Sequence, residues 1–108
     1  MKIPDSIRIN GVEYEIGYAS NPRIDNRLVF GLIEYNNSRI ILSDTDGTEH
    51  QMRCQTLWHE ILHGIRNANG MEIEDEEAVV EMFSKGIYQV LQDNGKRLFD
   101  IKESEQNA

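Results

Sequence analysis

The apolar residues of this chain change their spacing at about residue 50. Before that point, short apolar and β-branched runs alternate with polar turns, which is typical of strands. After it, apolar residues recur every three or four positions, which is typical of amphipathic helices. Strands followed by helices predict an α+β domain, with a small antiparallel sheet at the N-terminus and two packed helices after it.

The first half is expected to form short strands joined by turns. Asn10-Gly11 separates two β-prone runs, and this pair is the strongest local signal for a hairpin because both residues tolerate positive φ. A polar loop is expected over residues 19–27. Residues 28–35 and 39–42 indicate two further strands.

The second half is expected to form two helices. The first carries a continuous apolar stripe, and the Asn-Ala-Asn-Gly run at residues 67–70 supplies its stop signal. The second begins near Asp75, and Asn94-Gly95 indicates its C-cap. The first apolar stripe consists of Cys54, Leu57, Trp58, Ile61, Leu62 and Ile65, and the second of Val79, Val80, Phe83, Ile87, Val90 and Leu91.

A chain of 108 residues is long enough for one domain. We assign residues 1–101 to this domain, with strands mainly in 1–49 and the two helices in 50–95. Residues 102–108 are expected to form a frayed tail. The hydrophobic fraction of 39% suffices for a modest core and is too high for a disordered chain.

Charge and cysteine content exclude several classes of protein. Nineteen acidic residues against eleven Lys and Arg give a net charge of −8, which disfavours direct binding to nucleic acid or anionic membranes. No apolar stretch approaches the roughly 20 residues that span a bilayer, and the N-terminus lacks the apolar region of a signal peptide, so we expect a cytoplasmic protein. The single cysteine, Cys54, excludes an internal disulfide and a multi-cysteine zinc cluster, and is expected to be a buried free thiol.

Two of the three histidines lie in one pentapeptide, His59-Glu60-Ile61-Leu62-His63. On a helix, side chains four positions apart project from the same face with Cβ atoms about 5–6 Å apart, so both imidazoles can reach one metal ion. Glu60 lies next to His59, within reach of a metal-bound water. The pentapeptide matches the HExxH signature of zinc metallopeptidases, and the apolar stripe independently places it in a helix. The sequence therefore predicts one zinc ion (Zn2+) per chain.

A catalytic zinc ion keeps three protein ligands and one open position, so a third ligand is required. The candidates are the acidic residues at the start of the second helix, which would also stabilise the helix dipole without any metal. Glu76 lines up with the centre of the apolar face, whereas Glu77 lies on its flank. Periodicity favours Glu76 and leaves Glu77 open as the alternative.

Residues 77–84, Glu-Ala-Val-Val-Glu-Met-Phe-Ser, resemble a helix of the small gluzincins of bacteria and their phages, the repressor-cleaving ImmA/IrrE-type metallopeptidases. In that family HExxH is followed by a helix of the form Glu-x-x-Ala-Asn-x-Phe-Ala, whose first Glu is the third zinc ligand. The chain matches this pattern at Glu77 and Phe83, and carries Val80 and Glu81 in place of Ala and Asn. The Asn position is polar in the family, and Glu81 could support a ligand histidine from there.

The resemblance covers residues 28–94 and implies a minimal zincin-like metallopeptidase fold. It implies a phage- or prophage-encoded zinc metallopeptidase that hydrolyses a peptide bond in a specific protein partner. It also implies His59, His63 and Glu77 as the metal ligands. Glu60 would accept a proton from the attacking water and pass it to the leaving amine.

Two alternatives remain open. One is a non-catalytic zinc-binding interaction module that retains the fold, although metal binding alone does not require Glu60. The other is a structural zinc site with a fourth protein ligand.

Tyr88 shares a helical stripe with Glu77 but is expected to be a core or rim tyrosine rather than an oxyanion ligand. His50 is expected to be an exposed residue ahead of the helix. Residues 39–42 could pair with an extended substrate by β-augmentation.

Overall fold

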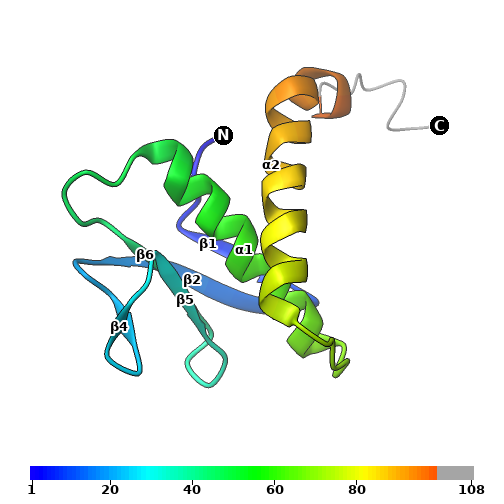
Figure 1. Ribbon diagram of the computed structural model, residues 1–108. Helices are drawn as coiled ribbons and strands as arrows, with labels where there is room; N and C mark the ends of the chain where they lie inside the picture. The colour runs from blue at the N-terminus through cyan, green and yellow to red at the C-terminus, as the bar shows by residue number, and fades with distance from the viewer. Residues whose placement is uncertain (100–108) are drawn as a thin grey trace.

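The computed structural model describes residues 1–99 (Figure 1). It has a four-stranded sheet, a two-stranded hairpin and two helices, which is the α+β arrangement expected from the sequence. The expected tail at residues 102–108 lies outside the described residues. The strands are β1 (Ser6–Ile9), β2 (Val12–Ala19), β3 (Arg23–Ile24), β4 (Arg27–Leu28), β5 (Gly31–Glu34) and β6 (Arg39–Ser43), and the helices are α1 (His50–Ala68) and α2 (Glu76–Phe99).

The four-stranded sheet has the order β1-β2-β6-β5. β1 and β2 form an antiparallel hairpin through Asn10 and Gly11, whose φ angles are 47° and 84°, so this predicted turn is confirmed. β5 and β6 are also antiparallel, but β2 and β6 run parallel, with Glu15 opposite Arg39. The sheet is therefore mixed rather than entirely antiparallel, because the chain crosses over from β2 to β6 through the segment that holds β3, β4 and β5.

β6 lies in the interior of the sheet. Ile40, Ile41, Leu42 and Ser43 are all buried, and β6 has a neighbouring strand on each edge and α1 on one face. Because β6 pairs with β2 on one side and β5 on the other, the expectation that residues 39–42 pair with a substrate is wrong. β5 is the edge strand at this end of the sheet.

The segment expected to be a polar loop, residues 19–27, contains part of the β3–β4 hairpin instead. Its turn residues, Asp25 and Asn26, have φ angles of 51° and 66°, which is the conformation of a two-residue hairpin turn. At the base of the hairpin, the backbone N–H of Val29 donates to the carbonyl oxygen of Pro22 (2.9 Å). The hairpin therefore has its own turn and its own closing bond.

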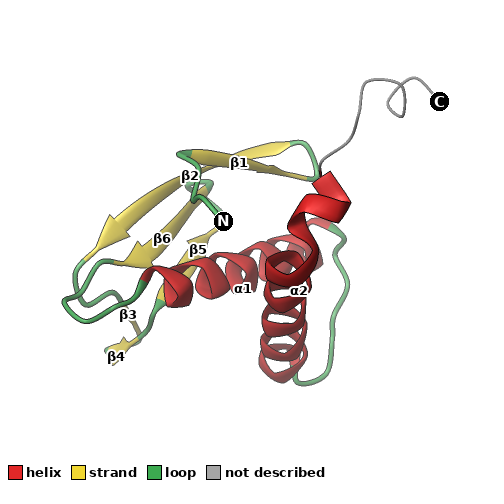
Figure 2. Ribbon diagram, turned by 90° about the horizontal axis from the view of Figure 1, so that it is seen from above, coloured by secondary structure: helices red, strands yellow, loops and turns green. Residues whose placement is uncertain are grey.

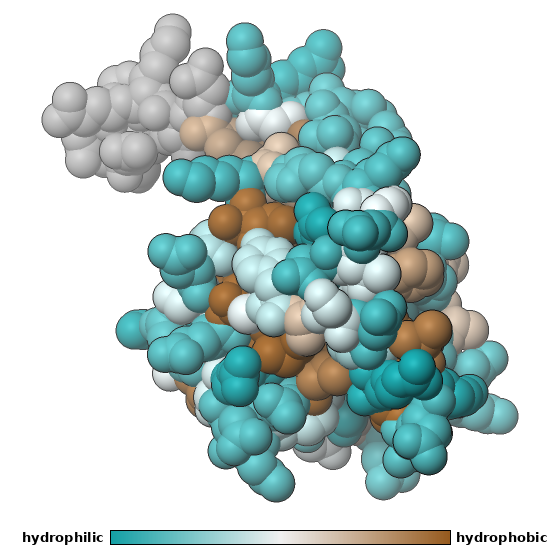
Figure 3. All heavy atoms as spheres, turned by 90° about the vertical axis from the view of Figure 1, so that its left-hand side faces the viewer, coloured by the Kyte–Doolittle hydropathy of each residue, from teal (hydrophilic) through white to brown (hydrophobic). Residues whose placement is uncertain are grey.

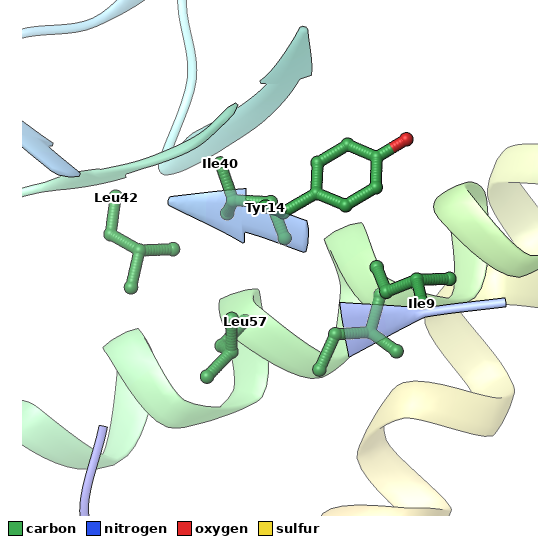
Figure 4. Close-up of a cluster of buried hydrophobic side chains, with 6 residues drawn as sticks. Ile9, Tyr14, Ile40, Leu42 and Leu57 are labelled. Atoms are coloured by element: carbon green, nitrogen blue, oxygen red, sulfur yellow. The ribbon is translucent and has the colours of Figure 1, made fainter. Parts of the chain in front are cut away.

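The core lies between the sheet and α1, which extends along one face of the sheet (Figures 2 and 4). Gly64 allows α1 to approach the sheet, because a Cβ atom there would lie 3.0 Å from Cδ1 of Ile9 and 3.2 Å from Cδ1 of Ile33. Side chains from β1, β2, β6 and α1 fill the space between the layers. The buried cluster consists of Ile9, Tyr14, Ile40, Leu42, Leu57 and Ile61.

β5 also approaches α1 closely, and this contact yields a prediction about stability. A Cβ atom on Gly31 would lie 2.5 Å from Cγ2 of Thr56 and 3.0 Å from the carbonyl oxygen of Ile41. We expect Gly31→Ala to lower the free energy of unfolding by about 1–3 kcal/mol because one of these groups must move. Adding Thr56→Ser, which removes Cγ2 and keeps the hydroxyl, should restore part of the loss. Urea unfolding of the single and double variants measures both effects, and an unchanged midpoint in Gly31→Ala would contradict the close packing.

The helix ends follow the sequence signals in α1 but not in α2. α1 stops as expected, with Gly70 at a φ of 61° and its N–H donating to the carbonyl oxygen of Asn67 (3.1 Å). α2 continues to Phe99, past the C-cap expected at Asn94-Gly95. Gly95 does not adopt the positive φ of a C-cap glycine, and Nδ2 of Asn94 donates to a carbonyl one turn earlier (3.1 Å). Neither helix in the described part of the chain has an apolar stretch long enough to cross a membrane.

α2 packs mainly on α1 (Figure 2). It buries only a narrow face. That face consists of Val80, Ser84 and Tyr88, spaced four residues apart. Phe83 and Val90, which were expected on the buried face, are 51% and 52% exposed. The buried stripe is narrower than the apolar stripe of the sequence because α2 packs on one helix and not on a whole sheet.

Candidate metal centre

The imidazoles of His59 and His63 lie side by side on α1, with their Nε2 atoms 3.1 Å apart. Glu77, in the first turn of α2, places Oε2 3.2 Å from Nε2 of His59 and Oε1 2.8 Å from Nε2 of His63. One ligand atom from each of the three residues lies within 4.8 Å of the other two. The structure therefore brings together three residues that the sequence put forward as metal ligands.

A carboxylate orients each imidazole at its other nitrogen. Oε2 of Glu76 lies 2.5 Å from Nδ1 of His63, and Oε2 of Glu81 lies 2.9 Å from Nδ1 of His59. When each Nδ1–H donates to its carboxylate, the Nε2 lone pairs of both rings face Glu77. Metal-binding histidines almost always donate their second N–H in this way, which fixes the tautomer and makes the ligand nitrogen more basic.

Glu76, which periodicity favoured as the third ligand, lies on the other side of His63. Its second carboxylate oxygen is 2.8 Å from Nε of Arg66, so Glu76 bridges the imidazole and the guanidinium group. The hydrogen bond with His63, together with the ion pair with Arg66, holds the pKa of Glu76 below its usual range, although burial acts in the opposite direction. Because α2 turns its Ser84 face towards α1, Glu77 and not Glu76 faces the two Nε2 atoms.

Glu60 is buried beside the two histidines, with 6% of its surface exposed. Withdrawal of the carboxylate from water is the largest influence on its pKa, which rises to about 7; the charges of His59 and His63 lower the pKa, and the charge of Glu77 raises it. A carboxyl group with a pKa near neutrality is suited to accept and return a proton at physiological pH.

The raised pKa of Glu60 predicts how the stability of the metal-free protein depends on pH. The folded protein, with a pKa of about 7 against the ordinary 4.5, holds the proton more tightly than the unfolded chain, so it loses stability as the pH rises from 4.5 to 7. Glu60→Gln should remove this loss and raise the free energy of unfolding at pH 8 by up to about 3 kcal/mol. Near pH 4 the substitution should give no such gain. Urea unfolding of both proteins in EDTA measures the difference, and equal stabilities at pH 8 would contradict the burial of a charged Glu60.

The candidate metal ligands lie in a cleft of about 890 Å³ between β5, α1 and α2. Glu77 forms part of its open side, with 74% of the side chain exposed. Among residues 1–99, the group that could hold one metal ion has three members and no fourth ligand. Two imidazole nitrogens and one carboxylate oxygen suit zinc, and three protein ligands at an open cleft are typical of catalytic rather than structural zinc sites.

The other residues singled out in the sequence lie outside this cleft. Tyr88 is 3% exposed on the buried face of α2, as expected for a core tyrosine. Cys54 is a buried free thiol, as expected, and Trp58 packs against the core cluster. His50 is exposed but is the first residue of α1 rather than part of the preceding loop, and its Nε2 lies 2.8 Å from the carbonyl oxygen of Met1.

Two contacts at the site were not predicted from the sequence. Glu76 connects His63 to Arg66, and the hydroxyl of Tyr35 donates to the backbone carbonyl of His63 (3.2 Å). The sequence did carry a signal for the contact between Glu76 and His63, because Glu76 is adjacent to Glu77. Neighbouring residues on a helix point about 100° apart around the axis. Two adjacent acids therefore contact different sides of one imidazole.

Comparisons of the chain with family models, with curated proteins and with solved structures found no match. The resemblance to the ImmA/IrrE-type peptidases therefore rests on the sequence of residues 28–94 alone, chiefly on HExxH at residues 59–63 and the segment at residues 77–84.

Proposed function

We propose that this protein is a zinc-dependent metallopeptidase that hydrolyses a peptide bond in a protein partner. The observation that carries the proposal is the orientation of the two imidazoles, whose Nδ1 atoms face carboxylates while their Nε2 atoms face Glu77. Zinc bound by His59, His63 and Glu77 would lower the pKa of a bound water to about 7 and polarise the carbonyl group of the substrate.

Glu60 moves the protons in this mechanism. Its carboxylate accepts a proton from the attacking water and then donates that proton to the leaving amine. In the metal-free protein, burial raises the pKa of Glu60 to about 7. Glu76 and Glu81 act as positioning residues, because they hold the two imidazole rings in the orientation that turns Nε2 towards Glu77.

β5 is the strand along which an extended substrate would bind. Gly31, Ile33 and Tyr35 line the cleft, and within residues 1–99 the only strand paired with β5 is β6. The free edge of such a strand can form backbone hydrogen bonds with an added peptide strand. Backbone pairing would hold the peptide beside His59 and His63 independently of most of its side chains.

The burial of Glu60 also argues against a module that only holds zinc. A carboxyl group whose pKa is raised to about 7 makes the folded protein less stable at neutral pH, and metal binding by the other three residues does not require it. Stability lost at a buried titratable group is typical of active sites.

The proposed activity is tested by incubating the zinc-loaded protein with peptides from a digested proteome and identifying new chain termini by mass spectrometry. We expect cleavage that EDTA abolishes and added zinc restores. Glu60→Gln, loaded with zinc in the same way, should give no new termini. If a folded wild-type protein that holds zinc leaves all peptides intact, the peptidase function is contradicted and the non-catalytic module takes its place.

A further inference from the structure

The β3–β4 hairpin and the residues that follow it present large apolar side chains to the cleft. Ile24, Leu28 and Phe30 line the cleft with 44%, 61% and 59% of their surfaces exposed, and Met52 of α1 lines it with 38% exposed. Figure 3 shows hydrophobic residues in brown between hydrophilic residues in teal on one face of the molecule. Scattered apolar residues are normal on a protein surface, but a group of them in one cleft is typical of a binding site.

One backbone hydrogen bond closes this hairpin at its base, and a second joins Phe30, which follows the hairpin, to the main sheet. The N–H of Val29 donates to the carbonyl oxygen of Pro22 (2.9 Å), and the N–H of Ser43 in β6 donates to the carbonyl oxygen of Phe30 (2.8 Å). A two-stranded hairpin is marginally stable by itself, so these bonds hold its apolar side chains at the cleft. The exposed side chains are therefore presented by an ordered element.

Contacts between β5 and α1 show which end of the cleft the hairpin occupies. Gly31, the first residue of β5, lies against Thr56, and Tyr35, just past its last residue, bonds to the backbone of His63. The hairpin precedes β5 in the chain, and Met52 lines the same cleft from the first half of α1. The apolar side chains therefore lie on the Thr56 side of the metal centre, along the line that a peptide paired with β5 would follow.

We propose that the hairpin forms a subsite for one bulky apolar side chain of an extended protein segment bound along β5. The inference rests on the proposed peptidase function and names its substrate class, which is protein segments with Leu, Ile, Phe or Met at one fixed position near the scissile bond. Leu28 and Phe30, the two most exposed of the large apolar side chains that line the cleft, contact this substrate residue and lose water when it binds.

The first test compares the cleavage specificity of zinc-loaded wild type and Leu28→Ser/Phe30→Ser on the same proteome-derived peptides. The matched control, Val12→Ser/Val90→Ser, replaces two exposed apolar residues outside the cleft. Wild type and control should cut at sites enriched in Leu, Ile, Phe or Met at one position. The hairpin variant should hold the same amount of zinc and show about a tenfold weaker preference. An unchanged preference in the hairpin variant would overturn the subsite.

A binding measurement separates failure of this inference from failure of the proposed function. Zinc-loaded Glu60→Gln is titrated into fluorescein-labelled peptides of Gly and Ser that carry a single Phe or a single Ala, and anisotropy is recorded. Tighter binding of the Phe peptide, lost when Leu28→Ser/Phe30→Ser is added, supports the subsite even if wild type cuts no peptide. Equal binding of the two peptides, with cleavage that shows no apolar preference, would overturn the subsite and leave the peptidase function in place.

Discussion

Glu77→Ala is expected to lower the affinity for zinc by more than about 100-fold, because it removes one of the three donor groups that face one another. Glu76→Ala and Glu81→Ala remove only the carboxylates at Nδ1, so each should lower the affinity by about 10- to 100-fold. Competition with a chromophoric zinc chelator gives the three affinities on one scale. The variant that loses the most zinc affinity identifies the ligand, and the variants that lose less identify the residues that orient the two histidines.

The control for this series is Glu72→Ala, which removes an exposed acidic residue from the loop before α2. Its zinc affinity should equal that of the wild type, so a general effect of lowering the negative charge would be recognised. A larger loss in Glu76→Ala than in Glu77→Ala would contradict the assignment and make Glu76 the third ligand.

Glu60→Gln is expected to lower kcat for peptide cleavage by about 10²- to 10⁴-fold while zinc remains bound. The amide has nearly the same shape as the carboxyl group it replaces but cannot accept a proton from the attacking water. Initial rates on a peptide that the wild type cuts, together with the zinc content of both proteins, measure the two effects separately.

Two outcomes would contradict the role given to Glu60. Cleavage at the wild-type rate in Glu60→Gln would show that another group accepts the proton. Loss of zinc from Glu60→Gln would show that the residue belongs to the ligand set rather than beside it. Glu72→Gln, which makes the same chemical change on an exposed acid, should leave both rate and zinc content unchanged.

The placement of the two histidines could be predicted from the sequence because it depends on one helix alone. Residues four apart on a helix share a face, and the apolar stripe of α1 identified that helix. The Asn10-Gly11 hairpin could be predicted for the same reason, since two adjacent residues determine the turn. The role of His59 and His63 as metal ligands stays a prediction.

The residue from α2 that faces the histidines could not be predicted from periodicity because it depends on how α2 is rotated about its own axis. Periodicity placed Phe83 and Val90 on the buried face and therefore favoured Glu76, but both are about half exposed. In the structure α2 packs on α1 with Val80, Ser84 and Tyr88 buried, and in this rotation Glu77 reaches the imidazoles. A resemblance of sequence motifs favoured Glu77 where helix periodicity did not.

In the sheet, too, features that depend on neighbouring residues could be predicted, and features that depend on segments far apart in the chain could not. The parallel pairing of β2 with β6 joins segments that are far apart in the chain, and no local pattern specifies it. The uninterrupted run Ile40-Ile41-Leu42 was a usable signal, because continuous apolar residues are typical of an interior strand. The β3–β4 hairpin was missed because its turn, Asp25-Asn26, resembles an ordinary polar loop in composition.

Crystals of the zinc-loaded wild-type protein, measured at the zinc absorption edge, decide where the metal ion binds. We predict one anomalous peak per chain, bonded to Nε2 of His59, Nε2 of His63 and a carboxylate oxygen of Glu77, with no fourth protein ligand. A peak between His50 and Cys54 instead, whose Nε2 and Sγ atoms lie 3.4 Å apart, or a fourth protein ligand at the predicted position, would contradict a catalytic zinc centre in this cleft.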